Sequence, residues 1–202
     1  DPDYASFFYS FLLFESINLI RSSRNLKKPI EQKNNKIADG VKTSGDIVNT
    51  KRIKNSAFLA FLDDNDLDEL INYANVRLFS AGEYIAIEGT KSDGINILLK
   101  GKVEASFTNL KDDQLENNSR SIARPGVALS LSSGFHEIES PYSLKATRDT
   151  TILKFSNEFI DNLIKTNPEL AIKFFKRQLW QLGRYIQSST GLTTYPAKNE
   201  KE

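Results

Sequence analysis

Glycines between short apolar runs constrain the fold of this chain more than any other feature. Residues 76–90 alternate apolar and polar side chains and are interrupted by Gly82 and Gly89, and residues 95–107 contain two apolar runs on either side of Gly101. Alternation over a few residues predicts half-buried strands, and a glycine between two such runs predicts a turn. We therefore expect several short strands here, with a hairpin at Gly101.

Strand patterns continue along the chain. Further short strands are expected at residues 121–126, 142–147 and 150–156. The polar stretch 109–120 is expected to form a loop at a hairpin tip. Asp149 and Thr150 are expected to form the turn between the last two strands. Many short strands with glycine turns are typical of a small antiparallel barrel or sandwich.

Helical patterns flank the strands on both sides. Residues 57–74 predict a short helix, a break and a second helix that Asp64 or Asn65 caps. After the strands, Ser156 is expected to cap one helix and Asn167 a second, longer one. The chain is therefore expected to be an α+β protein, mainly β, in which helices frame the strands.

The first 54 residues differ from the rest of the chain. Residues 4–20 are strongly apolar, but polar side chains interrupt them, and they are shorter than the roughly 20 residues that a membrane-spanning helix needs. They predict an apolar helix that packs on the folded domain, on a partner or on a membrane face. Residues 21–54 hold ten Lys or Arg against three Asp or Glu and few large apolar groups, which is typical of a linker. This basic stretch either stays solvated or meets a membrane surface, a nucleic acid or an acidic partner.

Four parts are therefore expected along the chain. They are an apolar N-terminal helix (1–24), a basic polar linker (25–54), a folded domain (55–190) and a polar tail (191–202). Because the chain begins at Asp1 and contains no Met, we expect it to be a fragment or a processed form. The absence of Cys and of a visible cleavable signal fits a cytoplasmic location, with membrane association left open.

The scarcity of reactive side chains argues against catalysis. The chain has no Cys, which excludes disulfides and thiol chemistry, and one His, which excludes His-cluster metal sites. That residue, His136, lies beside Glu137 and Glu139 with no nucleophile in the pattern, so a solvated charge pair is the expected arrangement. The acidic run 63–68 lacks the spacing and the terminal Glu of a calcium loop. We expect a protein that is not an enzyme and has no cofactor.

Residues 81–107 resemble the cyclic-nucleotide-binding domain of the catabolite-activator and kinase-regulatory-subunit type. The family's order and spacing are met by Gly82-Glu83, Ile85, Glu88-Gly89, Asp93, Ile97, Gly101 and Val103. Residues 58–79 resemble the family's entry helices, and residues 167–182 resemble its long C-terminal helix. The resemblance implies an antiparallel β-roll, a double-stranded β-helix of jelly-roll type, over residues 55–190, framed by N-terminal helices and a long C-terminal helix.

The phosphate-binding cassette is where the sequence departs from this family. The resemblance implies a Pro-Gly, then a Gly-Glu pair whose Glu holds the ribose, then an Arg that pairs with the cyclic phosphate. An ungapped count from Pro125-Gly126 places Ser130 and Leu131 at the Gly-Glu pair and Ser140 at the Arg position. The charge-assisted contacts of the family are therefore expected to be absent.

The conclusion that the family's arginine is absent does not depend on that count. No Arg lies between Arg124 and Arg148, and the one Lys there, Lys145, is expected on the following strand. Removing an ion pair with a ligand typically costs a few kcal/mol, roughly a hundredfold or more in affinity. Cyclic AMP and cyclic GMP are therefore expected to bind weakly, or not at all, in the family's mode.

The segment between those two arginines still offers hydroxyl groups. A neutral or weakly anionic ligand would meet Ser130, Ser132, Ser133, Gly134, Ser140, Tyr142 and Ser143. The alternative is a capped turn that closes over the roll, with Phe135 as a plug.

The predicted C-terminal helix carries an apolar stripe whose contact the sequence leaves open. The stripe comprises Leu170, Phe174, Leu179 and Leu182, and Trp180 lies off it. This helix either packs on the chain's own roll or associates with a second copy or another protein. Sequence-specific DNA binding is not expected, because a polar tail follows the long helix where the catabolite activators carry a recognition element.

Together these features predict a non-catalytic regulatory or assembly module. One alternative is a sensor of a different small ligand in the altered pocket. The other is the cytosolic regulatory tail of a membrane transporter or channel, which draws on the apolar N-terminal run and the basic arm.

Overall fold

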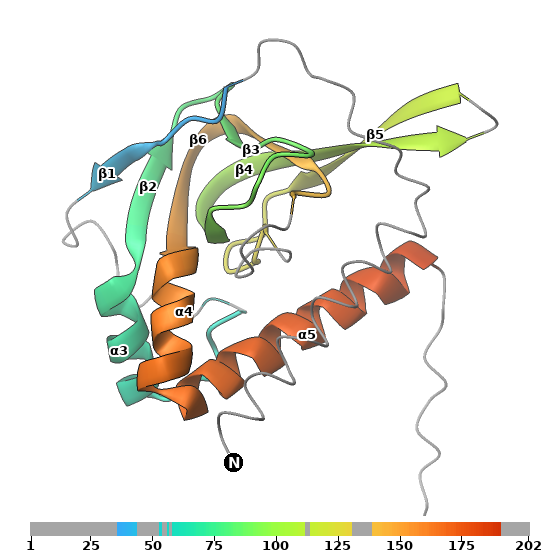
Figure 1. Cartoon of the computed structure of the whole chain (residues 1–202). Helices are drawn as coiled ribbons and strands as arrows, with labels where there is room; N and C mark the ends of the chain where they lie inside the picture. The colour runs from blue at the N-terminus through green and yellow to red at the C-terminus, as the bar shows by residue number, and fades with distance from the viewer. Residues whose placement is uncertain are drawn as a thin grey trace, which may run out of the picture.

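An antiparallel sheet curls into a roll, with helices at one end. The computed structural model describes residues 36–43, 53, 56, 58–111, 114–130 and 139–190. Within them the strands are β1 (Val41–Thr43), β2 (Asn75–Phe79), β3 (Tyr84–Ala86), β4 (Gly94–Lys111), β5 (Gln114–Ile122) and β6 (Ser143–Ser156). The hydrogen-bonded order is β1-β2-β6-β4-β5, with β3 also paired to β6. Figure 1 shows β4 and β6 arching together. The predicted mainly β, α+β fold is confirmed.

Gly101 bends a strand and does not end one. The hairpin predicted at Gly101 and the turn predicted at Asp149 and Thr150 are both wrong, because β4 and β6 run through these positions as continuous, paired strands. The β4–β6 register shifts between Leu98 and Val103, and Gly101 has a φ of 111°, which residues with a Cβ rarely adopt. The two long strands therefore bend at the same place, which shapes the sheet into a roll (Figure 1).

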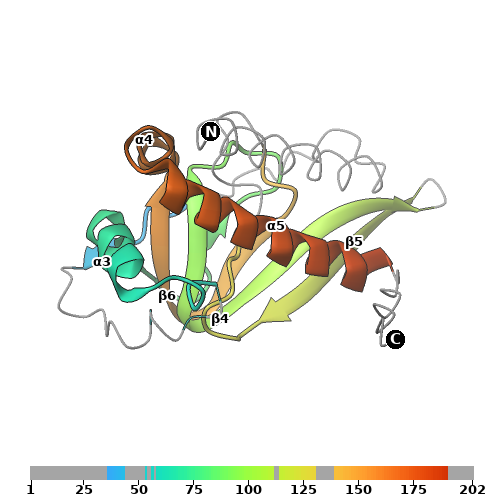
Figure 2. The same cartoon turned by 90° about the horizontal axis from the view of Figure 1, so that it is seen from below.

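The β4–β5 hairpin is longer than predicted. Nine residue pairs join the two strands, so the stretch 109–120, predicted as a loop, is mostly strand, whereas the strand predicted at 121–126 ends at Ile122. The pairing of β4 with β6 stops at Ser106, so the outer part of the hairpin projects as a two-stranded ribbon (Figures 1 and 2). A ribbon outside the core needs no apolar face, so the polar sequence carries no alternation to reveal it.

Three helices complete the described part of the chain: α3 (Asp64–Tyr73), α4 (Asn157–Thr166) and α5 (Pro168–Thr190). The predicted caps of α4 and α5 are confirmed. Ser156 Oγ accepts a hydrogen bond from the N–H of Phe159 at 3.2 Å, and Asn167 Oδ1 accepts one from the N–H of Leu170 at 3.1 Å. Each cap satisfies a backbone donor that the first turn of a helix leaves open.

The cap of α3 lies one residue earlier than predicted. Asp63 accepts a hydrogen bond from the N–H of Asp66 at 2.9 Å, so Asp63 is the N-cap, whereas Asp64 and Asn65 lie in the first turn. This backbone hydrogen bond lowers the pKa of Asp63. Lys173 of α5 reaches the same turn, with Nζ 2.5 Å from Asp66 Oδ2, and this contact raises the pKa of Lys173. The start of α3 is therefore tied to α5 by charge as well as by packing.

Part of the predicted linker joins the sheet. Strand β1 pairs with β2, and Ile37 forms a bridge with Tyr84 of β3. Residues 36–43 thus belong to the folded domain, although their composition resembles that of the linker around them. The apolar residues 4–20 and the tail 191–202 lie outside the described residues. Among the helices that are described, none has both the length and the apolar character needed to cross a bilayer.

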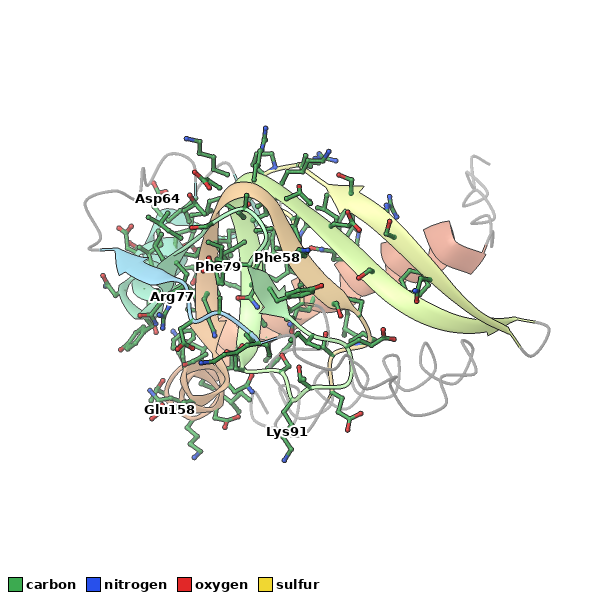
Figure 3. All side chains as sticks on the ribbon, turned by 90° about the horizontal axis from the view of Figure 1, so that it is seen from above. Phe58, Asp64, Arg77, Phe79, Lys91 and Glu158 are labelled. Carbon is green, nitrogen blue, oxygen red and sulfur yellow. The ribbon has the colours of Figure 1, made fainter. Side chains whose placement is uncertain are left out.

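Two apolar clusters fill the domain. The first lies between helices and sheet and contains Phe58, Phe155, Phe174 and Phe175, which are almost fully buried. The second lines the roll and comprises Phe79, Ile85, Leu98, Val103, Leu129, Leu144, Ala146 and Ile152. Figure 3 shows the labelled Phe58 and Phe79 among the interior side chains, with Asp64, Lys91 and Glu158 pointing outward. Each cluster joins residues far apart in sequence, so the roll and the helices form one packed domain.

Candidate ligand-binding site

The backbone on both sides of the predicted cassette is anchored to the roll. On the first side, the N–H of Leu129 donates to the carbonyl of Asn96 in β4 at 2.6 Å. On the second side, Ser140 exchanges two backbone hydrogen bonds of 2.8 Å with residues 89–90. Residues 131–138 between these anchors lie outside the described residues. The cassette therefore begins beside β4 and ends beside the turn after β3.

Ser130, the first predicted pocket residue, pairs with a buried amide. Its Oγ accepts a hydrogen bond from Asn96 Nδ2 at 3.0 Å, and the two residues are 5% and 3% exposed. Asn96 lies in the apolar run of β4, where an amide left without a partner would cost about 1–3 kcal/mol. The contact satisfies Asn96 and leaves the O–H proton of Ser130 available for a second hydrogen bond.

The Tyr142 hydroxyl joins the two sides of the cassette, and Ser140 supports Tyr142 from the second side. The Tyr142 hydroxyl donates to the carbonyl of Leu129 at 2.5 Å, and the Ser140 hydroxyl donates to the carbonyl of Tyr142 at 2.6 Å. Both hydroxyl protons are therefore used within the protein. The pair holds the second side of the cassette against the first.

Ser143 completes the described part of the predicted pocket. It is fully buried, and its Oγ accepts a hydrogen bond from the N–H of Glu88 at 3.0 Å. Like Ser130, it keeps an O–H proton. The four described pocket residues thus lie on the two sides of the cassette, and each makes an internal hydrogen bond. The remaining predicted pocket residues, Ser132, Ser133 and Gly134, lie outside the described residues, as does Phe135.

The cations that follow the cassette are engaged elsewhere. Lys145 Nζ lies 5.3 Å from the centre of the Tyr84 ring, a cation–π contact on the outside of β6. Arg148, the first arginine after the cassette, donates from Nη2 to the carbonyl of Gly101 at 3.0 Å. Its guanidinium therefore stabilises the strand bend.

Sequence reasoning missed Asn96 and Glu88 as partners of the pocket serines. Asn96 did leave a signal, because it is the one polar residue in the apolar run 95–99. A polar side chain in a buried strand needs a hydrogen-bonding partner. No such signal marks Glu88, since its contact uses only the backbone N–H, which every residue except proline has.

Replacing Tyr142 by Phe is expected to lower the free energy of unfolding by about 1 kcal/mol, because it removes the hydroxyl that joins the two sides of the cassette. Urea denaturation measures the effect. Tyr73→Phe is the matched control, since this ring is 52% exposed and stacks on Phe159 through its face. The control should change stability by less than about 0.5 kcal/mol. Equal losses in the two variants would contradict the role assigned to Tyr142.

One hollow in the described part of the chain lies outside the roll. It is an open groove of about 570 Å³ beside the end of α3 and the start of α4 and is lined by Tyr73, Ser156, Glu158, Phe159, Asp161, Asn162 and Lys165. Its mixed charges and open shape point to no particular ligand. Within the described ranges, His, Cys, Asp and Glu form no group of three or more that could hold a metal ion.

The apolar stripe predicted on the C-terminal helix faces the chain's own core. Leu170 and Phe174 of α5 are 1% and 0% exposed, and Leu179 packs against the same cluster. The side chain of Leu182 lies outside the described residues. Trp180 points the other way and is 51% exposed. Any association through this helix would therefore use its outer side, and not Leu170 or Phe174.

Comparisons with known proteins agree with this geometry. The model of the family "Cyclic nucleotide-binding domain" matches residues 76–167. A cyclic nucleotide-binding domain from Methylobacillus flagellatus KT superposes with a TM-score of 0.63 and 15% identity, over 70% of this chain and 80% of that one. The catabolite activator protein of Thermus thermophilus superposes with a TM-score of 0.54 and 23% identity, over 66% and 59% of the two chains.

A third solved structure is a regulatory subunit of a cAMP-independent protein kinase A from Trypanosoma brucei. It is a mutant bound to cAMP in its A site and superposes with a TM-score of 0.53 and 19% identity, over 69% of this chain and 49% of that one. No curated protein matches the sequence significantly. At these identities the solved structures establish the fold of the roll and its helices.

Proposed function

We propose that this chain, whose residues 76–167 match the cyclic nucleotide-binding domain model, is a non-catalytic regulatory or assembly module that does not bind cyclic AMP or cyclic GMP in the family's usual mode. The observation that carries the proposal is the absence of any Arg between Arg124 and Arg148. A cyclic phosphate held in a roll needs a cation or several N–H donors to replace its water.

The described sides of the cassette support the same conclusion. Ser140, at the position where the family's arginine is expected, donates its hydroxyl to a backbone carbonyl and is only 7% exposed. Arg148 is engaged at the strand bend. The Trypanosoma brucei subunit offers a parallel, since it is described as cAMP-independent, and one of the substitutions in its cAMP-bound mutant replaces Thr by Arg.

We expect isothermal titration calorimetry of the full chain to detect no binding of cyclic AMP or cyclic GMP in the micromolar range, and thermal unfolding to be unchanged by either nucleotide. A nucleotide present at a hundredfold excess over its dissociation constant would stabilise the folded state by about 2.7 kcal/mol. Low micromolar binding of either nucleotide would overturn the proposal. Ser140→Arg is expected to gain affinity for cyclic AMP over both the native chain and Ser140→Gln, which adds similar bulk without the charge.

A second candidate function is a sensor of a different, neutral ligand. It draws on Ser130 and Ser143, whose hydroxyls accept hydrogen bonds from the protein and keep a proton to donate. A thermal-shift screen of uncharged nucleosides and sugars tests it, because a ligand that binds only the folded state raises Tm. A raised Tm that Ser130→Ala abolishes would favour this function over the first.

The third candidate, a cytosolic tail of a membrane transporter or channel, draws on the N-terminal sequence. Residues 4–20 are apolar, and residues 21–54 carry a net charge of +7. Co-sedimentation with anionic and neutral liposomes tests it. Binding that requires anionic lipid and falls with salt would favour this role.

A further inference from the structure

One side of α5 combines positive charge with an exposed aromatic ring. Lys173, Lys176, Arg177 and Trp180 follow one another at the spacing that places residues on the same side of a helix. Lys173 and Lys176 are exposed, and Trp180 is 51% exposed. The opposite side of α5 faces the core through Leu170 and Phe174. This helix therefore presents a basic aromatic surface away from the roll.

A second aromatic ring from another element extends this surface. Arg177 Cζ lies 4.0 Å from the centre of the Trp180 ring and 5.9 Å from the centre of the Phe61 ring, so the guanidinium lies near both. Phe61 precedes α3 and is 39% exposed. Three large apolar side chains are exposed in the described part of the chain, and this surface holds two of them. A cluster of exposed rings with a charged border is typical of an interaction site. We refer to Phe61, Lys173, Lys176, Arg177 and Trp180 as the Trp180 surface.

The chain itself contains a segment with the complementary chemistry. Residues 4–20 are rich in Phe, Leu and Ile, and the first 20 residues contain Asp1, Asp3 and Glu15 but no Lys or Arg. An apolar segment with negative charge matches a surface of rings and positive charge. A second copy of the domain would instead bring Lys176 and Arg177 against the same cations, and like charges oppose such a contact.

The connection between the segment and the surface is long enough. The first described residue is Lys36, next to the bridge between Ile37 and Tyr84 on the roll. Residues 21–35 can span up to about 50 Å when extended. A domain of this size has a radius of gyration of about 15 Å, so any point on its surface is within reach. A tether of this length also raises the local concentration of the segment to the millimolar range or so.

We propose that residues 4–20 dock on the Trp180 surface of the same chain. The contact covers the rings of Trp180 and Phe61 with the apolar side chains of the segment and places Glu15, with Asp1 and Asp3 just before the segment, near the cations of α5. It is independent of nucleotide binding by the roll. In this arrangement α5 is the element that connects the N-terminal segment to the folded domain.

Fluorescence of Trp180 tests the proposal directly, because this is the single Trp of the chain. The full chain is compared with a variant that carries Phe7→Ser, Phe11→Ser and Phe14→Ser, and with a control that carries Ser6→Ala and Ser10→Ala. We expect the emission maximum to shift to longer wavelength and acrylamide quenching to increase in the first variant only, at every protein concentration. Circular dichroism checks that both variants are folded.

Three results would overturn the proposal. The first is an emission spectrum that does not respond to the three Phe substitutions. The second is shielding of Trp180 that depends on protein concentration, which would assign the surface to a second copy. The third is shielding that appears only with anionic vesicles, which would assign the surface to a membrane.

Cross-linking provides a second measurement that does not disturb the apolar side chains. Since the chain has no Cys, Ser10→Cys with Lys176→Cys gives a unique pair for a short bismaleimide. We expect a cross-link within one chain. The control pairs Ser10→Cys with Lys100→Cys, an exposed residue at the strand bend. Equal yields for the two pairs, or links only between chains, would contradict the docking.

Discussion

Gly101→Ala is expected to lower the free energy of unfolding by about 2–6 kcal/mol, a large part of the 5–15 kcal/mol that typical domains possess. Two costs add. Gly101 has a φ of 111°, and holding alanine there costs about 1–3 kcal/mol. A Cβ at this position would also lie 2.4 Å from Thr150 Oγ1 and 2.6 Å from Thr150 Cα, and forced overpacking costs about 1–3 kcal/mol. The clash involves the backbone of β6, so rotation of a side chain cannot relieve it. Urea denaturation followed by circular dichroism measures the loss.

Two other glycines separate these costs. Gly82 has a φ of 94° but no atom within 4 Å of an added Cβ, so Gly82→Ala carries the conformational cost alone, about 1–3 kcal/mol. Gly183 lies in α5 with open space around it, and Gly183→Ala is expected to stabilise the domain by about 0.5–1 kcal/mol. If Gly101→Ala cost no more than Gly82→Ala, the close approach of β4 and β6 at the bend would be wrong.

Phe174→Ala is expected to cost about 3–5 kcal/mol, the range for removing a large buried aromatic side chain. Phe174 is fully buried, and its ring centre lies 5.4 Å from that of Phe58 and 5.7 Å from that of Phe155, both in edge-to-face geometry. The ring therefore joins α5 to the segment before α3 and to β6. Its removal leaves a cavity among three elements that cannot close without moving the helix. Thermal and urea unfolding both measure the loss.

Tyr73→Ala is the control for this prediction. Tyr73 is also a large aromatic residue but is 52% exposed, so the expected cost is about 1 kcal/mol or less. Similar losses at the two positions would mean that α5 does not pack on the sheet through Phe174.

Helix caps, which depend on residues close together in the sequence, were predicted well. Ser156 and Asn167 cap α4 and α5 as expected, because a cap needs only a side-chain oxygen and an N–H about three residues later. The cap of α3 was missed by one residue. Asp63, Asp64 and Asn65 can each serve as a cap, and Lys173, more than a hundred residues away, favours the observed start through its contacts with Asp63 and Asp66.

The ligand-binding role of the candidate site stays a prediction. Its four described residues were chosen for their hydroxyls, and the sequence did not indicate their hydrogen-bonding partners. Tyr142 uses its hydroxyl on the carbonyl of Leu129, and nothing in the sequence specifies which backbone carbonyl lies beside a given side chain. The same holds for β1, whose residues look like linker and pair with β2 through backbone groups alone.

The sequence by itself determined three features of this protein. It placed a glycine at 101, where the chain changes direction, and helix caps at 156 and 167, and it left residues 125–147 without arginine. Only the tertiary structure decided what the glycine does. A positive φ suits both a hairpin turn and a bend within a strand. The choice depends on whether a partner strand continues past the glycine. Here β6 continues through Asp149 and Thr150, so β4 bends with it and the sheet becomes a roll.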